Sequence, residues 1–271
     1  SRSWLIPVAM LCAGLGVSLT GVGPSFQMGL AVAGLSGLGV AAFHPEGARL
    51  VNYLAGDRKA TAMSFFAIGG QLGYAIGPLT ATAAMLLWGL QGTISLVVPT
   101  TLVAGLLMFS LPGVSTGRGT AKGGQRRERV EGARDAWVPF VVLSAALLCR
   151  SVIFYGLNTF LPLFWINVLH QSKAAGGTAL TVLMASSIGG NLLGGRMADR
   201  FGYRIVAIAG LIFLMITLPL LTLADSATQA LLLLVPIGVG LALPTSPMVV
   251  LGQGYLPNRV GLASGVTLGL A

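Results

Sequence analysis

Nine long apolar runs, separated by short polar connections, set the strongest limit on what this chain can fold into. Hydrophobic residues make up 55% of the chain and charged residues 8%, whereas soluble domains carry about 25% charged residues. No single soluble core could bury so much apolar surface, and most runs approach the ~20 residues that cross a bilayer as a helix. The sequence therefore predicts an all-α integral membrane protein. The runs are Trp4–Thr20, Met28–Phe43, Ala62–Trp88, Thr93–Leu111, Ala136–Leu169, Thr178–Leu193, Ile205–Leu223, Leu231–Leu251 and Val260–Ala271.

The sequence contains none of the common motifs that place catalytic or metal-binding residues together. The sequence has no Walker loop, no HExxH, no cysteine cluster and no Ser-His-Asp set that fits one face. Cys12 and Cys149 lie in apolar runs, where small packing residues are expected. We therefore expect no cofactor, no metal ligand and no catalytic residue. The 39 glycines favour closely packed helices over a membrane β-barrel.

The positions of the basic residues indicate which connections lie on the cytoplasmic side of the membrane. The chain has a formal net charge of +9, yet all but two of its 16 basic residues lie in or beside alternate connections, which share one side of the membrane. By the positive-inside rule this side is the cytoplasm, so the charge does not predict a nucleic-acid partner. The expected location is the cell (inner) membrane, with several passes through the bilayer and a monomeric chain.

The longest polar connection divides the chain into two parts. Residues 112–135 are rich in Gly, Arg and Glu, as in a solvated linker, so we expect helical bundles at 1–111 and 136–271. A weak repeat relates them: Arg2 matches Arg204 at an offset of 202, and 57–59 match 258–260 at an offset of 201. Because the last apolar run is too short to span a bilayer, we expect the chain to be a piece of a longer protein. It would then hold the third to eleventh of twelve membrane segments.

The most distinctive polar segment, residues 195–204, is expected to form a tight loop between two membrane helices. Gly195 and Gly202 let helix ends approach and turn, and Asp199 can accept hydrogen bonds from a neighbouring helix N-terminus. Arg200 and Arg204 are suited to anchoring the loop in the aqueous interface. The pattern G-x-x-x-D-R-x-G-x-R resembles the signature loop of the major facilitator superfamily, which implies a conformational latch. Tyr203 and Ile205 stand at positions that are usually basic in that loop.

A second polar cluster, His44, Glu46 and Arg49, follows the second apolar run. Histidine as a residue type titrates near neutral pH, so the cluster could serve as a proton site or part of a gate. The alternative is a helix broken at Pro45 whose polar residues snorkel to the interface. The phrase F-H-P-E, with glycines around it, resembles the corresponding stretch of fosmidomycin-resistance-type transporters.

The third run carries glycines at 69, 73 and 77, followed by Pro78. Their spacing forms one small-residue stripe that permits close helix contact, with a bend at the proline. G-x-x-x-G-P also resembles a motif of the antiporter branch of the superfamily. Gln71 is the polar residue on this run that we expect to face a transport pathway.

Arg150 is the clearly intramembrane basic residue of the fifth run, with Tyr155 and Asn158 on or beside the same helix face. A lipid-facing Arg costs roughly 2.5–3.5 kcal/mol on insertion scales, so it must face a partner or a water-filled cavity. It could contact an anionic substrate group, or instead snorkel from a helix that begins later. The eighth run, with prolines at 236, 244 and 247, predicts a bent or broken helix.

These resemblances imply a major facilitator fold of two pseudo-symmetric helical bundles that work by alternating access. They imply an antiporter that exchanges protons for exported small molecules and confers antibiotic resistance of the fosmidomycin type. Two alternatives stay open: an uptake symporter of a small organic anion, and a membrane-embedded enzyme that uses His44 and Glu46 as acid and base. A sensor would need a soluble output domain, which the linker does not contain.

Topology gives the first testable prediction. We expect the linker to be cytoplasmic because six basic residues cluster there. A cysteine placed at Ser115 in intact cells should resist a membrane-impermeant maleimide and react only after permeabilisation. Ready labelling from outside would reverse the topology.

Overall fold

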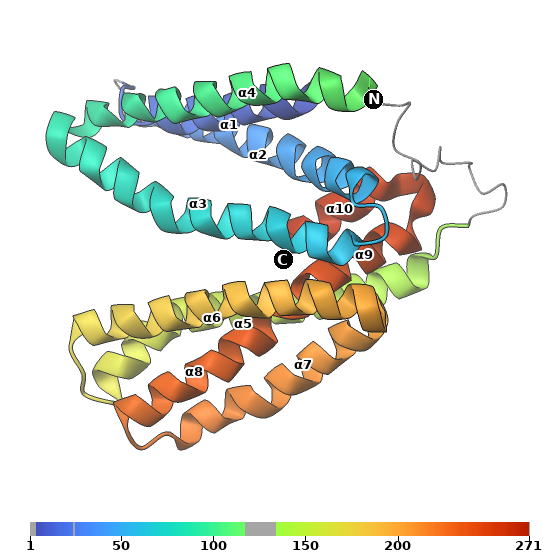
Figure 1. Cartoon of the computed structure of the whole chain (residues 1–271). Coiled ribbons are helices and arrows are strands. Elements are labelled where there is room, and N and C mark those ends of the chain that lie inside the picture. Colours follow the sequence, from blue (N-terminus) through green and yellow to red (C-terminus); the bar gives the residue numbers. More distant parts are fainter. Residues whose placement is uncertain (1–3, 24, 117–133, 271) are drawn as a thin grey trace. The chain divides into compact units, whose positions relative to one another are not determined.

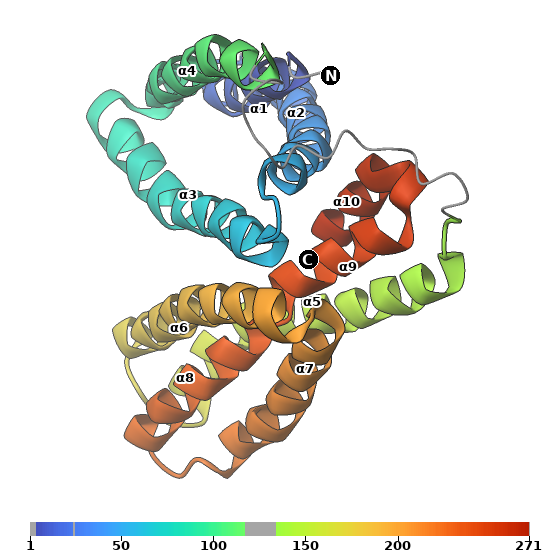
Figure 2. The same ribbon diagram turned by 45° about the vertical axis from the view of Figure 1, so that its right-hand side comes forward.

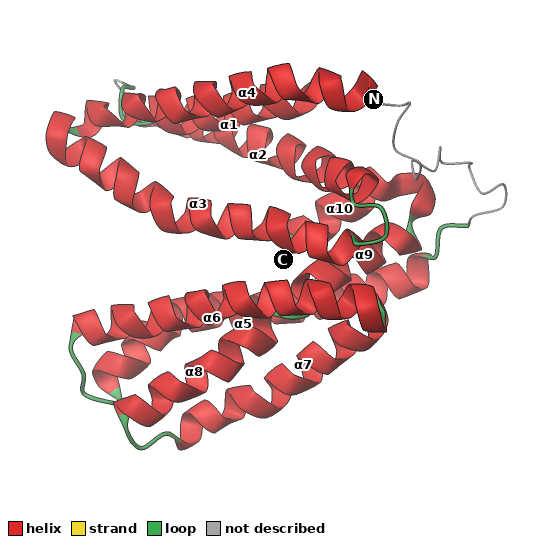
Figure 3. Cartoon of the chain, in the orientation of Figure 1, coloured by secondary structure: helices red, strands yellow, loops and turns green. Residues whose placement is uncertain are grey.

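The structure is a computed structural model that describes residues 4–23, 25–116 and 134–270. These residues form α-helices and short 3-10 helices, with no strand in the described ranges (Figure 3). Within the described residues, five segments are long and apolar enough to cross a membrane: Phe26–Leu54, Leu90–Ser110, Trp137–Asn167, Tyr203–Leu223 and Ala227–Tyr255. Large apolar side chains point outward, among them Phe109, which is 88% exposed, as expected where lipid replaces water. The all-α membrane fold is confirmed, and the larger number of spans stays a prediction.

The described residues form two compact units. One comprises 4–50 and 70–116, and the other comprises 51–69 and 134–270. Most of the predicted linker, residues 117–133, lies outside the described residues. The bundle boundaries at 111 and 136 therefore stay a prediction.

In the first unit, helix α1 (Leu5–Leu19) packs against α4 (Val97–Thr116), as both views of the chain show (Figures 1 and 2). A Cβ at Gly14 would lie 2.1 Å from the Thr100 side chain, so this contact needs a glycine. The 3-10 helix η1 (Leu90–Leu96) precedes α4 and is tied to the end of α1, because the Thr93 hydroxyl donates to the Ser18 carbonyl at 3.0 Å.

Helix α2 (Phe26–Leu54) is longer than its apolar run and continues through Pro45. The interpretation in which the helix breaks at Pro45 is therefore wrong. A proline inside a helix removes only one N–H donor, and the following residues keep the helical bonding. Helix α3 (Lys59–Trp88) also continues past Pro78, whose side chain lies outside what the structure describes.

In the second unit, α5 (Trp137–Asn167), α6 (Lys173–Phe201), α7 (Tyr203–Leu220) and α8 (Ala227–Ala242) surround a core that includes Trp165, Leu183 and Leu234. The short 3-10 helix η2 (Leu221–Leu223) follows α7. Helix α6 runs to Phe201, so the ten-residue loop predicted at 195–204 is wrong: only Gly202 separates α6 from α7. Residues such as Arg, Met and Ala are good helix formers and extend the helix into the polar segment.

The predicted break in the eighth run is confirmed. Helix α8 ends at Ala242, and α9 (Thr245–Tyr255) begins three residues later, after Leu243 and Pro244. The 3-10 helix η3 (Pro257–Arg259) and α10 (Val260–Gly269) complete the described chain. Proline has no N–H to donate, so the ladder of helical bonds is interrupted where Pro244 and Pro247 enter it.

Helices α6 and α8 are in direct backbone contact. A Cβ at Gly190 would lie 2.6 Å from the Val239 carbonyl oxygen, and one at Gly194 would lie 2.0 Å from the Leu243 carbonyl oxygen. Gly238 meets α6 in the same way, 2.6 Å from the Leu183 carbonyl oxygen. The predicted use of glycine for close helix packing therefore holds at this interface.

This interface yields a matched pair of variants. Gly190→Ala in the full-length protein should destabilise it by about 1–3 kcal/mol, because the added methyl forces α6 and α8 apart. Gly189→Ala is the control, since a Cβ there has no described atom within 4 Å. Thermal unfolding in detergent measures both. Equal melting temperatures for Gly190→Ala and Gly189→Ala would contradict the packing.

Candidate functional site

The end of α6 is bonded to the beginning of α3. Asp199 accepts hydrogen bonds from two backbone N–H groups, that of Ala60 at 2.9 Å and that of Thr61 at 2.8 Å. The first N–H groups of a helix have no partner within it and carry a partial positive charge, so a carboxylate there is favourable. The contact expected for Asp199 is present.

Both glycines of the segment are required by the geometry. A Cβ at Gly195 would lie 2.2 Å from the Ser64 hydroxyl and 2.7 Å from the Ala60 carbonyl oxygen, so a larger residue would push α3 away from α6. Gly202 has φ of 99°, a backbone conformation that L side chains rarely adopt. It lets α7 start with only one residue between it and the end of α6.

Arg200 and Arg204 are both exposed, as expected for groups in an aqueous interface. The Arg200 guanidinium lies 5.3 Å from the centre of the Phe201 ring and belongs to the last turn of α6, where a cation is favourable. Arg204 lies in the first turn of α7. The phenol of Tyr203, at a position that is usually basic, lies close enough to interact with Asp199 and Asp57.

Two further polar contacts attach residues 51–69 to the helices of the same unit. The Ser64 hydroxyl donates to the Asn191 carbonyl at 2.8 Å, and the Asn191 side chain accepts from the Ser246 hydroxyl at 2.6 Å. The Asn52 amide donates to the side-chain oxygen of Gln253. Asn191 and Gln253 therefore make structural hydrogen bonds between helices.

The sequence did not single out Ser64 or Asn52. Ser64 stands one helical turn after Ala60, on the face of α3 that meets Gly195. Its partner is 127 residues away, and that of Asn52 is 201 residues away, so no local pattern connects them. The repeat offset of 201 was the one signal that could have paired Asn52 with Gln253.

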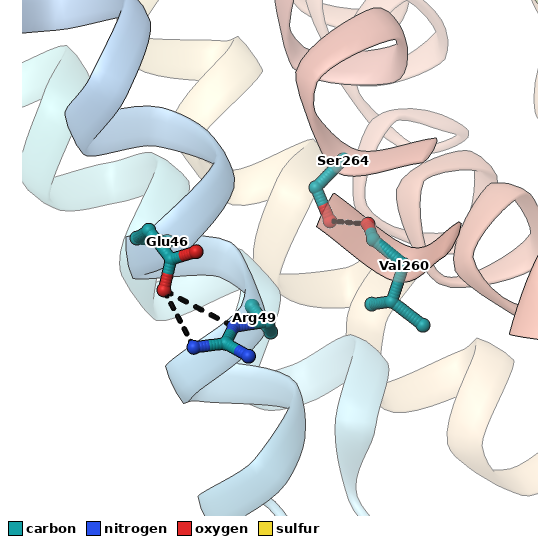
Figure 4. A network of polar contacts seen from close by, with 4 residues as sticks. All are labelled: Glu46, Arg49, Val260 and Ser264. Atoms are coloured by element: carbon teal, nitrogen blue, oxygen red, sulfur yellow. Dashed lines mark hydrogen bonds and ion pairs between the residues drawn. The ribbon is translucent and has the colours of Figure 1, made fainter. Parts of the chain in front are cut away.

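His44, Glu46 and Arg49 lie on α2, in the first unit, and Figure 4 shows the contact between Glu46 and Arg49. The Glu46 carboxylate pairs with the Arg49 guanidinium, with oxygen–nitrogen distances of 2.7 and 3.1 Å. The His44 Nδ1 lies 3.1 Å from the Val40 carbonyl oxygen. Glu46 therefore has its counter-charge one helical turn away, and its side chain is 19% exposed.

Arg150 is buried inside the second unit, with 5% of its surface exposed. Its Nε donates to the Leu241 carbonyl at 2.7 Å, near the end of α8. The interpretation in which Arg150 snorkels to the interface is therefore wrong, because its side chain is held by a carbonyl where the helical bonding of α8 stops. The other two candidates on α5 are not buried with it: Asn158 donates to the Phe154 carbonyl of its own helix, and Tyr155 is 61% exposed.

The predicted packing stripe on α3 meets no neighbour in the part of the chain that the structure describes. A Cβ at Gly69, Gly73 or Gly77 would have no described atom within 4 Å. The side-chain oxygen of Gln71 is buried without a hydrogen-bond partner among the described residues. The packing role of the stripe and the pathway role of Gln71 stay predictions.

Metal chemistry has no geometric basis in the described ranges. No group of three His, Cys, Asp or Glu side chains there could hold a metal ion.

A chain of apolar helices with Asp199 bonded across helices from a G-x-x-x-D-R-x-G segment has the features of a secondary transporter. The chain belongs to the Major Facilitator Superfamily, whose family model matches residues 1–270.

Two relatives are similar along the whole chain. An uncharacterized MFS-type transporter, YfnC, of Bacillus subtilis is 27% identical over 277 residues, which cover 100% of this chain and 67% of the relative. The fosmidomycin resistance protein of Escherichia coli is 27% identical over 274 residues, 99% of this chain and 66% of the relative. The chain thus spans about two thirds of the length of each.

The Asp199 contact gives the third prediction. Asp199→Asn in the full-length protein should lower transport about fivefold or more while expression stays near normal, because the neutral amide is a weaker acceptor for the α3 N–H groups. Asp225→Asn, in the connection before α8, is the matched control. Wild-type transport by Asp199→Asn would show that the contact is dispensable.

Proposed function

We propose that this chain is part of a proton-coupled antiporter that exports small molecules from the cell, with phosphonates such as fosmidomycin as the first substrates to test. Family membership indicates a transporter rather than an enzyme. The name of the Escherichia coli relative supports export and resistance. The proposed setting is the inner membrane, with the basic linker in the cytoplasm and the chain acting as a monomer.

The observation that carries this proposal is the pair of bonds from Asp199 to the first turn of α3. Alternating access needs contacts that hold one state and release in the other. Two hydrogen bonds to a charged acceptor are strong enough to bias such an equilibrium. Gly195, Asp199, Arg200, Gly202 and Arg204 are therefore proposed to form a conformational latch.

The Glu46–Arg49 pair is the proposed proton-coupling group. When Glu46 carries its negative charge, it neutralises Arg49; when it takes up a proton, this ion pair is lost and the arginine is free to attract an anion. His44, two residues before Glu46 on the same helix, is proposed as a second proton-binding group of this cluster. Gln71, Arg150, Tyr155 and Asn158 are proposed to line the pathway.

A second candidate function is uptake symport of a small organic anion. The buried guanidinium of Arg150 favours it, because a fixed positive charge inside the protein attracts an anion whichever way it moves. Export and uptake differ in the sign of coupling: export exchanges the substrate for a proton, and symport carries both in the same direction.

Proteoliposomes with an imposed pH gradient test the coupling role. With radiolabelled fosmidomycin as the probe, Glu46→Gln should lose uphill transport driven by the gradient, because glutamine cannot bind and release a proton. Glu128→Gln in the linker is the matched control. Normal uphill transport with normal pH dependence by Glu46→Gln would show that the coupling group lies elsewhere.

A further inference from the structure

A buried glutamine joins three segments of the second unit. Gln253 on α9 is 3% exposed and uses both ends of its amide. Its oxygen accepts from the Asn52 amide, and its nitrogen donates to the Ser264 hydroxyl of α10 at 2.9 Å. Ser264 donates in turn to the Val260 carbonyl at 2.8 Å (Figure 4). Gln253 is thus held in place from the α10 side, independently of Asn52.

The two bonded amides occupy equivalent positions in the two repeats. Gly39 packs on Ala13: a Cβ at Gly39 would lie 2.3 Å from the backbone nitrogen of Ala13. Gly240 packs on Leu214 in the same way, because a Cβ at Gly240 would lie 3.2 Å from the backbone nitrogen of Leu214. Both members of the second pair follow those of the first by 201 residues. The same helix contact is therefore made twice at this offset. Asn52 and Gln253 are also 201 residues apart.

A bond between equivalent positions has a particular consequence in a protein with two related halves. Rocking one repeat against the other changes the separation of equivalent residues directly, whereas contacts inside one repeat are unaffected. Water can replace Asn52 on the Gln253 oxygen at small net cost, because a neutral hydrogen bond contributes little beyond what water offers. Ser264 would keep the glutamine oriented while the bond is open.

We propose that Asn52 and Gln253 form a gate bond, which is made when the transport pathway is closed at the end carrying the 195–204 segment and broken when that end opens. The inference rests on the proposed transport function. It adds two gating residues that act beside Asp199, of which Asn52 is not revealed by the polar pattern of the sequence. Ser64, fully buried against Asn191, is then accessible only in the open state.

Cross-linking tests the gate bond. The full-length protein, with Cys12 and Cys149 replaced by Ala, receives Asn52→Cys and Gln253→Cys and is oxidised in proteoliposomes. We expect an intramolecular disulfide that lowers fosmidomycin transport at least about tenfold, with recovery on reduction, because a covalent bond removes the open state. Asp135→Cys with Arg259→Cys is the control, since this 3.6 Å ion pair joins two segments of one repeat and its cross-link should leave the rate unchanged.

The cross-linking outcomes are decisive in both directions. Failure of the Asn52–Gln253 pair to cross-link, or normal transport by the cross-linked protein, overturns the proposal. If the reduced protein carries no fosmidomycin, the proposed substrate is wrong, and the gate is then judged by labelling.

Labelling needs no substrate. A single cysteine at Ser64 should react with a small water-soluble maleimide about fivefold faster when Asn52 is replaced by Ala, because loss of one hydrogen bond populates the open state. Asn258→Ala, at an exposed position in η3, is the control for nonspecific loosening. An unchanged labelling rate in Asn52→Ala would overturn the gate bond even if transport were never observed.

Discussion

Every helix placed in hydrocarbon must have its backbone polar groups satisfied inside the protein, and helix ends are where this is hardest. In this chain, side chains from other helices meet the demand. The Asp199 carboxylate binds free N–H groups at the start of α3, and the Arg150 guanidinium binds a carbonyl near the end of α8. An anion at an N-terminus and a cation at a C-terminus both match the helix dipole. Asp199 and Arg150 thus supply partners for backbone groups at helix ends.

Hydropathy and charge were sufficient to predict an all-helical membrane protein, because lipid leaves few other solutions for runs of this length. The break between α8 and α9 was also predictable, since Pro244 and Pro247 remove two N–H donors close together. Asp199 was found from its spacing to Gly195 and Gly202. Each of these features is determined by residues that lie close together in the sequence, so a local pattern was enough to predict it.

The errors arose where tertiary contacts decide. Pro45 does not end α2, and residues 195–201 continue α6, because one missing donor or a few polar side chains cost less than ending a packed helix. The two interpretations of Arg150 could not be separated from the sequence, because the carbonyl that binds its buried side chain lies 91 residues away. Ser64 and Asn52 were missed for the same reason. Long-range hydrogen bonds cannot be predicted from hydropathy, and the repeat offset indicates only the bond between Asn52 and Gln253.

The glycine contacts between α6 and α8 have a mechanical consequence. At Gly190 and Gly194 the two backbones touch without intervening side chains, so no rotamer change can absorb a displacement of one helix relative to the other. We therefore expect a shift of α6 at Asp199, one turn beyond Gly195, to displace the backbone at Leu243, which lies between α8 and α9. We therefore expect the 195–204 segment and the break between α8 and α9 to move together as one rigid unit.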